Sequence, residues 1–126
     1  MSKIESVHMM RAVMPISILV KLVDDLSKRL EYSTNGVSLN YLFKGVHRAA
    51  QKHNVYLYDF DIGWDGEITS DGFWKDIRNM HGWGYGRVEG NNIKLTEDGK
   101  EFAKSLEYEE PVKTAFDKVF SEEDSL

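Results

Sequence analysis

The stretch Tyr85–Phe102, YGRVEGNNIKLTEDGKEF, decides the fold because two strand-like runs in it lead directly into the start of a helix. The runs 86–88 and 93–95 flank the residues EGNN, in which Gly and Asn tolerate the positive φ of a tight hairpin turn. Thr96 then stands at an N-cap position, where its hydroxyl accepts a hydrogen bond from a free amide of the first turn. The stretch therefore predicts an antiparallel hairpin within residues 85–96, followed by a capped helix.

A helix is also predicted immediately before this hairpin, from Thr69 or Ser70 as its cap to about His81. The order of a helix, a two-stranded wing and a second helix is that of a winged helix-turn-helix, so we predict an α+β fold of this class. The apolar faces of these elements are expected to meet in one core, formed by Phe73, Ile77, Leu95, Phe102 and Leu106.

Two helices are predicted outside this unit, over 15–32 and 111–121, and each has a proline suited to a first helical turn. The first has an apolar face that is wider than a surface helix needs. Two explanations remain open: the N-terminal 30 residues form a homodimer contact, or helix 111–121 covers the same face within one chain.

Composition indicates a single domain over residues 1–126, with 41% hydrophobic residues and no cysteine. The longest apolar run, 12–20, is far shorter than the roughly 20 residues of a membrane span. The N-terminus does not have the pattern of a signal peptide. We therefore expect a cytoplasmic protein that does not interact with membranes.

A basic ridge is predicted on the helix that begins at the cap Ser38 and ends near His53. Lys44, Arg48 and Lys52 are spaced by four, which places them along one helix face. Residues 1–54 hold 8 Lys or Arg against 4 Asp or Glu, although the net charge of the chain is −5. The ridge is either a solvated surface or a surface that contacts phosphates.

Residues 55–62 alternate as in a β-strand, and GWDG follows as a turn. The acidic residues Asp59, Asp61, Asp65 and Glu67 of this region are interpreted as a solvent face, with a hard cation as the alternative ligand. The four histidines have no zinc-site spacing, and no nucleophile and base are paired in a recognisable motif. We therefore predict no metal, no cofactor, no catalytic residue and no enzymatic activity.

The aromatic residues around the helix before the wing have two interpretations, core packing or an exposed contact surface. These residues are Trp64, Phe73, Trp74, Trp83 and Tyr85.

The residues Ile93–Phe102, IKLTEDGKEF, resemble the signature hydrophobic-x-Leu-Thr-x-x-Gly of winged helix transcription regulators. The stretch Tyr58–Gly99 is similar to small prokaryotic winged-helix proteins related to Panacea-type antitoxin domains. The resemblance covers about residues 38–107. It implies that Thr69–His81 is a recognition helix and that Arg87–Lys94 is the wing.

Two functions follow from this sequence. The first is a dimeric DNA-binding transcriptional regulator, in which one set of side chains contacts phosphates and another lies near base edges. The predicted phosphate-contacting residues are Lys44, Arg48, Lys52, Arg87 and Lys94, and those near base edges are Lys75, Arg78 and Asn79. The alternative is a phage-encoded or antitoxin-like adaptor or inhibitor that binds a protein instead of DNA, which Asp71 and Asp76 on the recognition helix favour.

Overall fold

The computed structural model describes residues 14–29 and 36–121 of the chain, which form an α+β fold. Its helices are α2 (Pro15–Ser27), α3 (Leu39–His53), α4 (Asp71–Gly82), α5 (Glu97–Lys104) and α6 (Glu110–Val119). Its strands are β1 (Val37–Ser38), β2 (Asp61–Ile62), β3 (Ile68–Thr69), β4 (Gly86–Glu89) and β5 (Asn92–Leu95). None of the helices in the described ranges is long and apolar enough to cross a membrane.

The predicted hairpin is confirmed as β4 and β5, which pair antiparallel around a turn with Gly90 at φ +61°. β1 adds to the other edge of β5 through the pair Val37↔Ile93, giving the strand order β1-β5-β4. The helix after the hairpin is also confirmed, because Thr96 Oγ1 accepts a hydrogen bond of 3.1 Å from the Gly99 amide.

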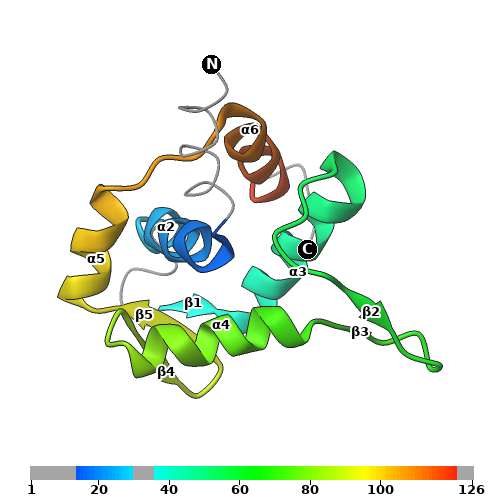
Figure 1. Ribbon diagram of the computed structural model, residues 1–126, viewed down its shortest axis with the longest axis horizontal. Coiled ribbons are helices and arrows are strands. Elements are labelled where there is room, and N and C mark those ends of the chain that lie inside the picture. Colours follow the sequence, from blue (N-terminus) through cyan, green and yellow to red (C-terminus); the bar gives the residue numbers. More distant parts are fainter. Residues whose placement is uncertain (1–13, 30–35, 122–126) are drawn as a thin grey trace.

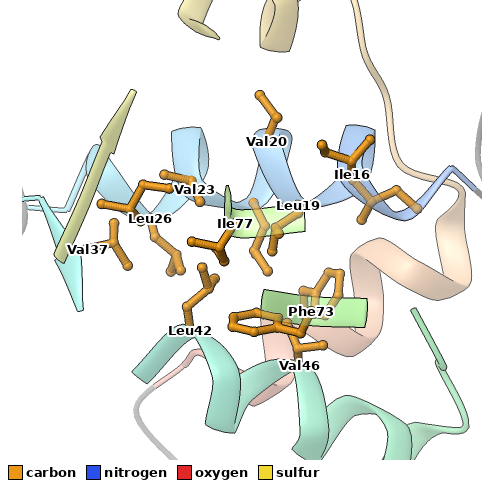
Figure 2. Packing of buried hydrophobic residues seen from close by; sticks show 14 of the residues in the cluster. Ile16, Leu19, Val20, Val23, Leu26, Val37, Leu42, Val46, Phe73 and Ile77 are labelled. Atoms are coloured by element: carbon orange, nitrogen blue, oxygen red, sulfur yellow. The ribbon is translucent and has the colours of Figure 1, made fainter. Parts of the chain in front are cut away.

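The core is centred on α2, which packs against α4, α5 and the β1-β5-β4 sheet (Figure 1). Leu19, Val20 and Val23 of α2 have no exposed surface. Figure 2 shows α2 above Leu42 of α3 and Phe73 of α4, which are also fully buried. Burial on this scale is the main favourable contribution to folding, at about 25 cal/mol per Å² of apolar surface.

The helix predicted from Pro111 is confirmed as α6, and it packs against α3. Phe120 at its C-terminal end is buried edge-on to the ring of Tyr41, with 5.2 Å between the ring centres. The ring of Phe120 also lies against Gly45, where an added Cβ would approach a carbon of that ring to within 2.0 Å. In the described ranges, the apolar residues of α2 are covered within one chain, but mainly by α4, α5 and the sheet, whereas the second explanation assigned this role to helix 111–121.

The first helix ends earlier than predicted, at Ser27 and not at Tyr32. The amides of Lys28 and Arg29 donate to carbonyls three residues back, those of Asp25 and Leu26, and this tighter pattern closes the helix. Residues 30–35 lie outside the described residues, as do residues 1–13, the N-terminal part of the predicted dimer contact.

The prediction of one strand over residues 55–62 is wrong, since only Asp61 and Ile62 are in a strand. Val55 and Tyr58 are buried while Tyr56 and Asp59 are exposed, so burial does not alternate as it does in a strand. The Tyr58 hydroxyl donates a 2.7 Å hydrogen bond to Asp76 of α4. This contact with a distant part of the chain sets the path of the segment.

The predicted core is confirmed for Phe73, Ile77 and Leu95, and Phe102 packs against its edge. Leu106 is not among the described residues that form or flank this core. α5 ends at Lys104, so Leu106 lies on the irregular segment that leads to α6 and is only partly buried.

Candidate nucleic-acid interface

Helix α4 presents one face to the core and the other to solvent. Ser70, one of the two predicted caps, is fully buried and accepts a 3.3 Å hydrogen bond from the Phe73 amide. Lys75 and Arg78 are exposed on the outer face, and Asn79 is partly buried beside them. The three residues predicted near base edges therefore share one helix, with the two cations on its solvent side.

Aromatic packing fixes α4 relative to α3. Phe43 of α3 lies stacked on Trp74, with 5.8 Å between ring centres, and edge-on to Phe73 at 5.1 Å. Phe73 and Trp74 are thus packing residues. Trp64 and Trp83, however, expose 101% and 59% of their surface. Core packing therefore explains two members of the aromatic set, whereas these two tryptophans agree with an exposed contact surface.

Polar contacts join the β4–β5 hairpin and the residues beside it to the end of α4 and to the turn that follows this helix. The Val88 amide donates to Nδ1 of His81 over 3.1 Å, and the Tyr85 amide donates to the Met80 carbonyl over 2.9 Å. The Thr96 hydroxyl donates to the Gly84 carbonyl. Sequence reasoning missed the role of His81, because its partner lies seven residues away on a different element.

The solvent face of the hairpin carries two adjacent cations. Arg87 lies directly opposite Lys94 in the strand register, and both side chains are exposed. Ile93 and Leu95 turn to the buried face of the sheet. Like charges at opposed positions of a ladder repel each other, so a nearby anion would relieve this pair.

The basic ridge on α3 faces solvent, with Lys44 and Lys52 exposed and Arg48 partly exposed. In Figure 1, α3 begins at β1 and extends away from the β4–β5 hairpin, so Lys52 lies at its distant end. Lys44 and Lys52 are about 12 Å apart along the helix axis. The structure therefore brings the cations of α4 and the hairpin onto connected elements, while the ridge leads away from them.

His47 lies next to the ridge, and its ring is edge-on to Phe60, with 4.8 Å between ring centres. Burial, together with the nearby charge of Arg48, lowers the pKa of His47 from its usual value of 6.5. The neutral form of this imidazole is therefore favoured over the protonated form more than in a free histidine.

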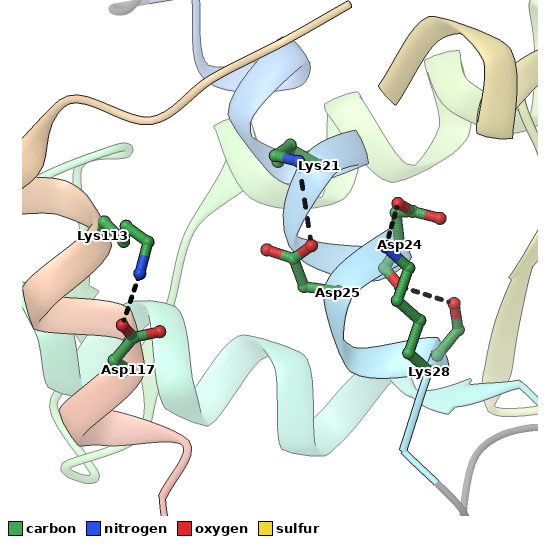
Figure 3. A network of polar contacts seen from close by, with 7 residues as sticks. Lys21, Asp24, Asp25, Lys28, Lys113 and Asp117 are labelled. Atoms are coloured by element: carbon green, nitrogen blue, oxygen red, sulfur yellow. Dashed lines mark hydrogen bonds and ion pairs between the residues drawn. The ribbon is translucent and has the colours of Figure 1, made fainter. Parts of the chain in front are cut away.

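The ion-paired basic side chains are different residues from the cations predicted to contact DNA. Lys21, Lys28 and Lys113 are paired with Asp25, Asp24 and Asp117 (Figure 3). Two lysines of α5 are paired with glutamates in the same way. Within the described residues, no ion pair or hydrogen bond of the side chain is found for the seven predicted cations. These are Lys44, Arg48, Lys52, Lys75, Arg78, Arg87 and Lys94.

No three His, Asp or Glu side chains in residues 14–29 and 36–121 are grouped so that they could hold a metal ion. Asp59, Asp61, Asp65 and Glu67 are all exposed, in agreement with a solvent face.

Comparison of the chain with models of protein families, with curated proteins and with solved structures found no match.

Proposed function

We propose that the chain is a winged helix-turn-helix protein that binds double-stranded DNA as a transcriptional regulator. The element order supports this proposal: a helix, a short strand, a second helix, the small β2–β3 hairpin, a third helix and the β4–β5 hairpin, with the strands of the larger sheet ordered β1-β5-β4. α4 would be the recognition helix and β4–β5 the wing. Homology to Panacea-type or other winged-helix groups is part of the same proposal.

The observation that carries the proposal is the opposed pair Arg87 and Lys94, which has no anionic partner in the described part of the chain. Phosphates are the anions that such a wing meets on a duplex, and each neutralised phosphate releases counterions and so adds affinity. α4 leads directly into this hairpin and presents Lys75 and Arg78 on its solvent face. Those side chains, with Asn79, would lie at base edges in the major groove.

The basic ridge on α3 is proposed to contact the phosphate backbone, with a contribution to affinity that decreases from the start of the helix to its end. Lys44 is nearest to the start of α3, and Lys52 lies near its far end. We therefore expect the loss of affinity to be larger for Lys44→Gln than for Lys52→Gln, with Arg48→Gln between them.

Fluorescence anisotropy with a labelled mixed-sequence duplex, measured over a series of salt concentrations, tests the proposal. Arg87→Gln and Lys94→Gln should each lower the magnitude of the slope of log K against log salt by about one. Lys100→Gln and Lys104→Gln are matched controls, because those lysines are exposed but paired on α5. The controls should leave the slope unchanged.

Absence of binding to any duplex at low salt would overturn the DNA proposal. It would leave the alternative, an adaptor or inhibitor that acts through protein contacts, as the better account. Loss of affinity in the control variants equal to that in the wing variants would also contradict the assigned surface.

A further inference from the structure

The β2–β3 hairpin extends from the body of the molecule between α3 and α4 (Figure 1). Its ladder has only two pairs, Asp61↔Thr69 and Ile62↔Ile68. Its tip is held by local hydrogen bonds: the Gly63 amide donates to the Glu67 carbonyl over 2.7 Å, and the Gly66 amide donates to the Gly63 carbonyl over 2.9 Å. A two-stranded ladder of this length is marginal by itself, but the bonded turn gives the tip a defined shape.

This hairpin exposes large apolar side chains. Ile62 exposes 72% of its surface and Trp64, at the tip, exposes 101%; Tyr56, on the segment that leads to the hairpin, exposes 64%. No residue from Asp61 to Thr69 is buried. Folding of the domain therefore does not account for the tryptophan, whereas exposed Trp is the side chain most enriched at the energetic centres of protein interfaces.

The charged residues of this segment of the chain all have the same sign. Residues 55–68 contain four Asp or Glu and no Lys or Arg. A hollow of about 430 Å³ beside the hairpin is lined by Asp59, Asp61 and Asp71 together with Tyr56 and other residues. Carboxylates next to an aromatic ring complement a Lys or Arg side chain, and they repel the phosphates of DNA.

We propose that the β2–β3 hairpin is a docking element for a basic protein partner. Trp64 and Ile62 enter an apolar pocket of that partner, and a Lys or Arg at the rim of the pocket occupies the hollow formed by Asp59, Asp61, Asp71 and Tyr56. This inference goes beyond DNA binding and does not depend on it, because the hairpin uses none of the residues assigned to the duplex.

Selection of random 12-residue peptides on the full chain, with counter-selection against Trp64→Ser, provides a defined probe. The enriched peptides should be net positive and contain an apolar anchor. A synthetic peptide of the enriched sequence should bind the wild-type chain and lose about tenfold or more in affinity for Trp64→Ser or Ile62→Thr. Asp59→Asn with Asp61→Asn should weaken binding and reduce its dependence on salt.

Trp83→Ser is the matched control, because Trp83 is exposed but lies outside this hairpin, and it should leave peptide affinity unchanged. The affinity for the DNA duplex should be the same for Trp64→Ser and wild type. The DNA-binding proposal and the docking proposal can therefore fail independently of each other. Enriched peptides that are acidic, or that bind Trp64→Ser as well as wild type, would overturn the docking proposal. Self-association of the chain that Trp64→Ser abolishes would also overturn it, since the occupant would then be a second copy.

Discussion

At the scale of single residues, Tyr58 shows how one side chain sets the path of a segment. Its ring is in the core, and its hydroxyl donates to Asp76 over a separation of 18 positions. Burial, and secondly the hydrogen bond and charge of Asp76, raise the pKa of the Tyr58 phenol, so it remains a neutral donor. The Asp76 carboxylate is partly buried, and the Tyr58 hydroxyl supplies it with a hydrogen-bond donor.

Tyr58→Phe is expected to lower the free energy of unfolding by about 1.5 kcal/mol, because a hydrogen bond to a charged group is lost while the ring is retained. Urea denaturation measures the change. Tyr56→Phe is the control, since Tyr56 is exposed, and its denaturation midpoint should match that of wild type. Equal midpoints for both variants would mean that the Tyr58 contact contributes nothing to stability.

His47 is expected to make the free energy of unfolding depend on pH. Its folded-state pKa is lowered, first by burial and then by Arg48, so near and below pH 6.5 the unfolded chain takes up a proton more readily than the folded one. The free energy of unfolding should therefore fall as pH decreases from 7.5 through 6.5, until the folded protein is protonated as well.

Urea denaturation at pH 7.5 and about 5.5 tests this expectation, at values above the usual range of carboxyl titration. The decrease on acidification should be smaller in His47→Gln than in wild type. A decrease in His47→Gln as large as that of wild type would refute the assignment.

At the scale of elements, the junction between the β4–β5 hairpin and α5 depends on Gly99. A Cβ at this position would lie 2.0 Å from the Tyr85 carbonyl oxygen, which is backbone and has no side-chain freedom. Leu95 also lies close, with a methyl carbon at 3.3 Å. The start of the β4–β5 hairpin can therefore approach α5 this closely only if residue 99 has no side chain.

Gly99→Ala is expected to destabilise the protein by about 1–3 kcal/mol through overpacking, despite the better helix propensity of alanine. Gly82→Ala is the matched control, because Gly82 lies at the end of α4 with nothing within 4 Å of an added Cβ. That substitution should be neutral or stabilise by up to about 1 kcal/mol. Thermal denaturation of the two variants measures the contrast, and equal effects would contradict the close approach.

At the scale of the whole molecule, the covering of α2 bears on the proposed homodimer. α4, α5 and the sheet cover the buried face of α2 in the described part of the chain, and α6 completes the core over α3. The wide apolar face of the helix therefore gives no argument for a second copy. The dimer contact remains a proposal that now depends on the segment before Met14.

Light scattering of the full chain, compared with a chain that begins at Met14, tests this proposal. A dimer mass for the full chain and a monomer mass for the shorter one are expected if the N-terminal residues form the contact. A monomer mass for the full chain at high micromolar concentration would remove the dimer, and a dimer mass for both would place the contact on the described residues.

Local signals in the sequence predicted the elements whose partners lie within a few positions. Ser38, Ser70 and Thr96 each accept a hydrogen bond from the amide three residues later, so their caps follow from residue type and spacing alone. The β4–β5 hairpin belongs to the same class, although its turn has only the two residues Gly90 and Asn91, because Glu89 and Asn92 pair at the end of the ladder. Local signals also sufficed to propose the eight candidate DNA-contacting residues, because helical spacing and the predicted hairpin place them on the surface of their elements.

Tertiary structure decided what depends on distant partners. β1 has only two residues, too few for a periodic pattern, and exists because Val37 pairs with Ile93. The path of residues 55–60 depends on Tyr58 reaching Asp76, and the attachment of the hairpin to α4 depends on His81. The ion pairs of the described residues are not of this kind, because each joins two side chains three or four positions apart on one helix and so follows from sequence spacing. The contacts of Tyr58 and His81 required the fold, because no local pattern brings side chains of separate elements within hydrogen-bond distance.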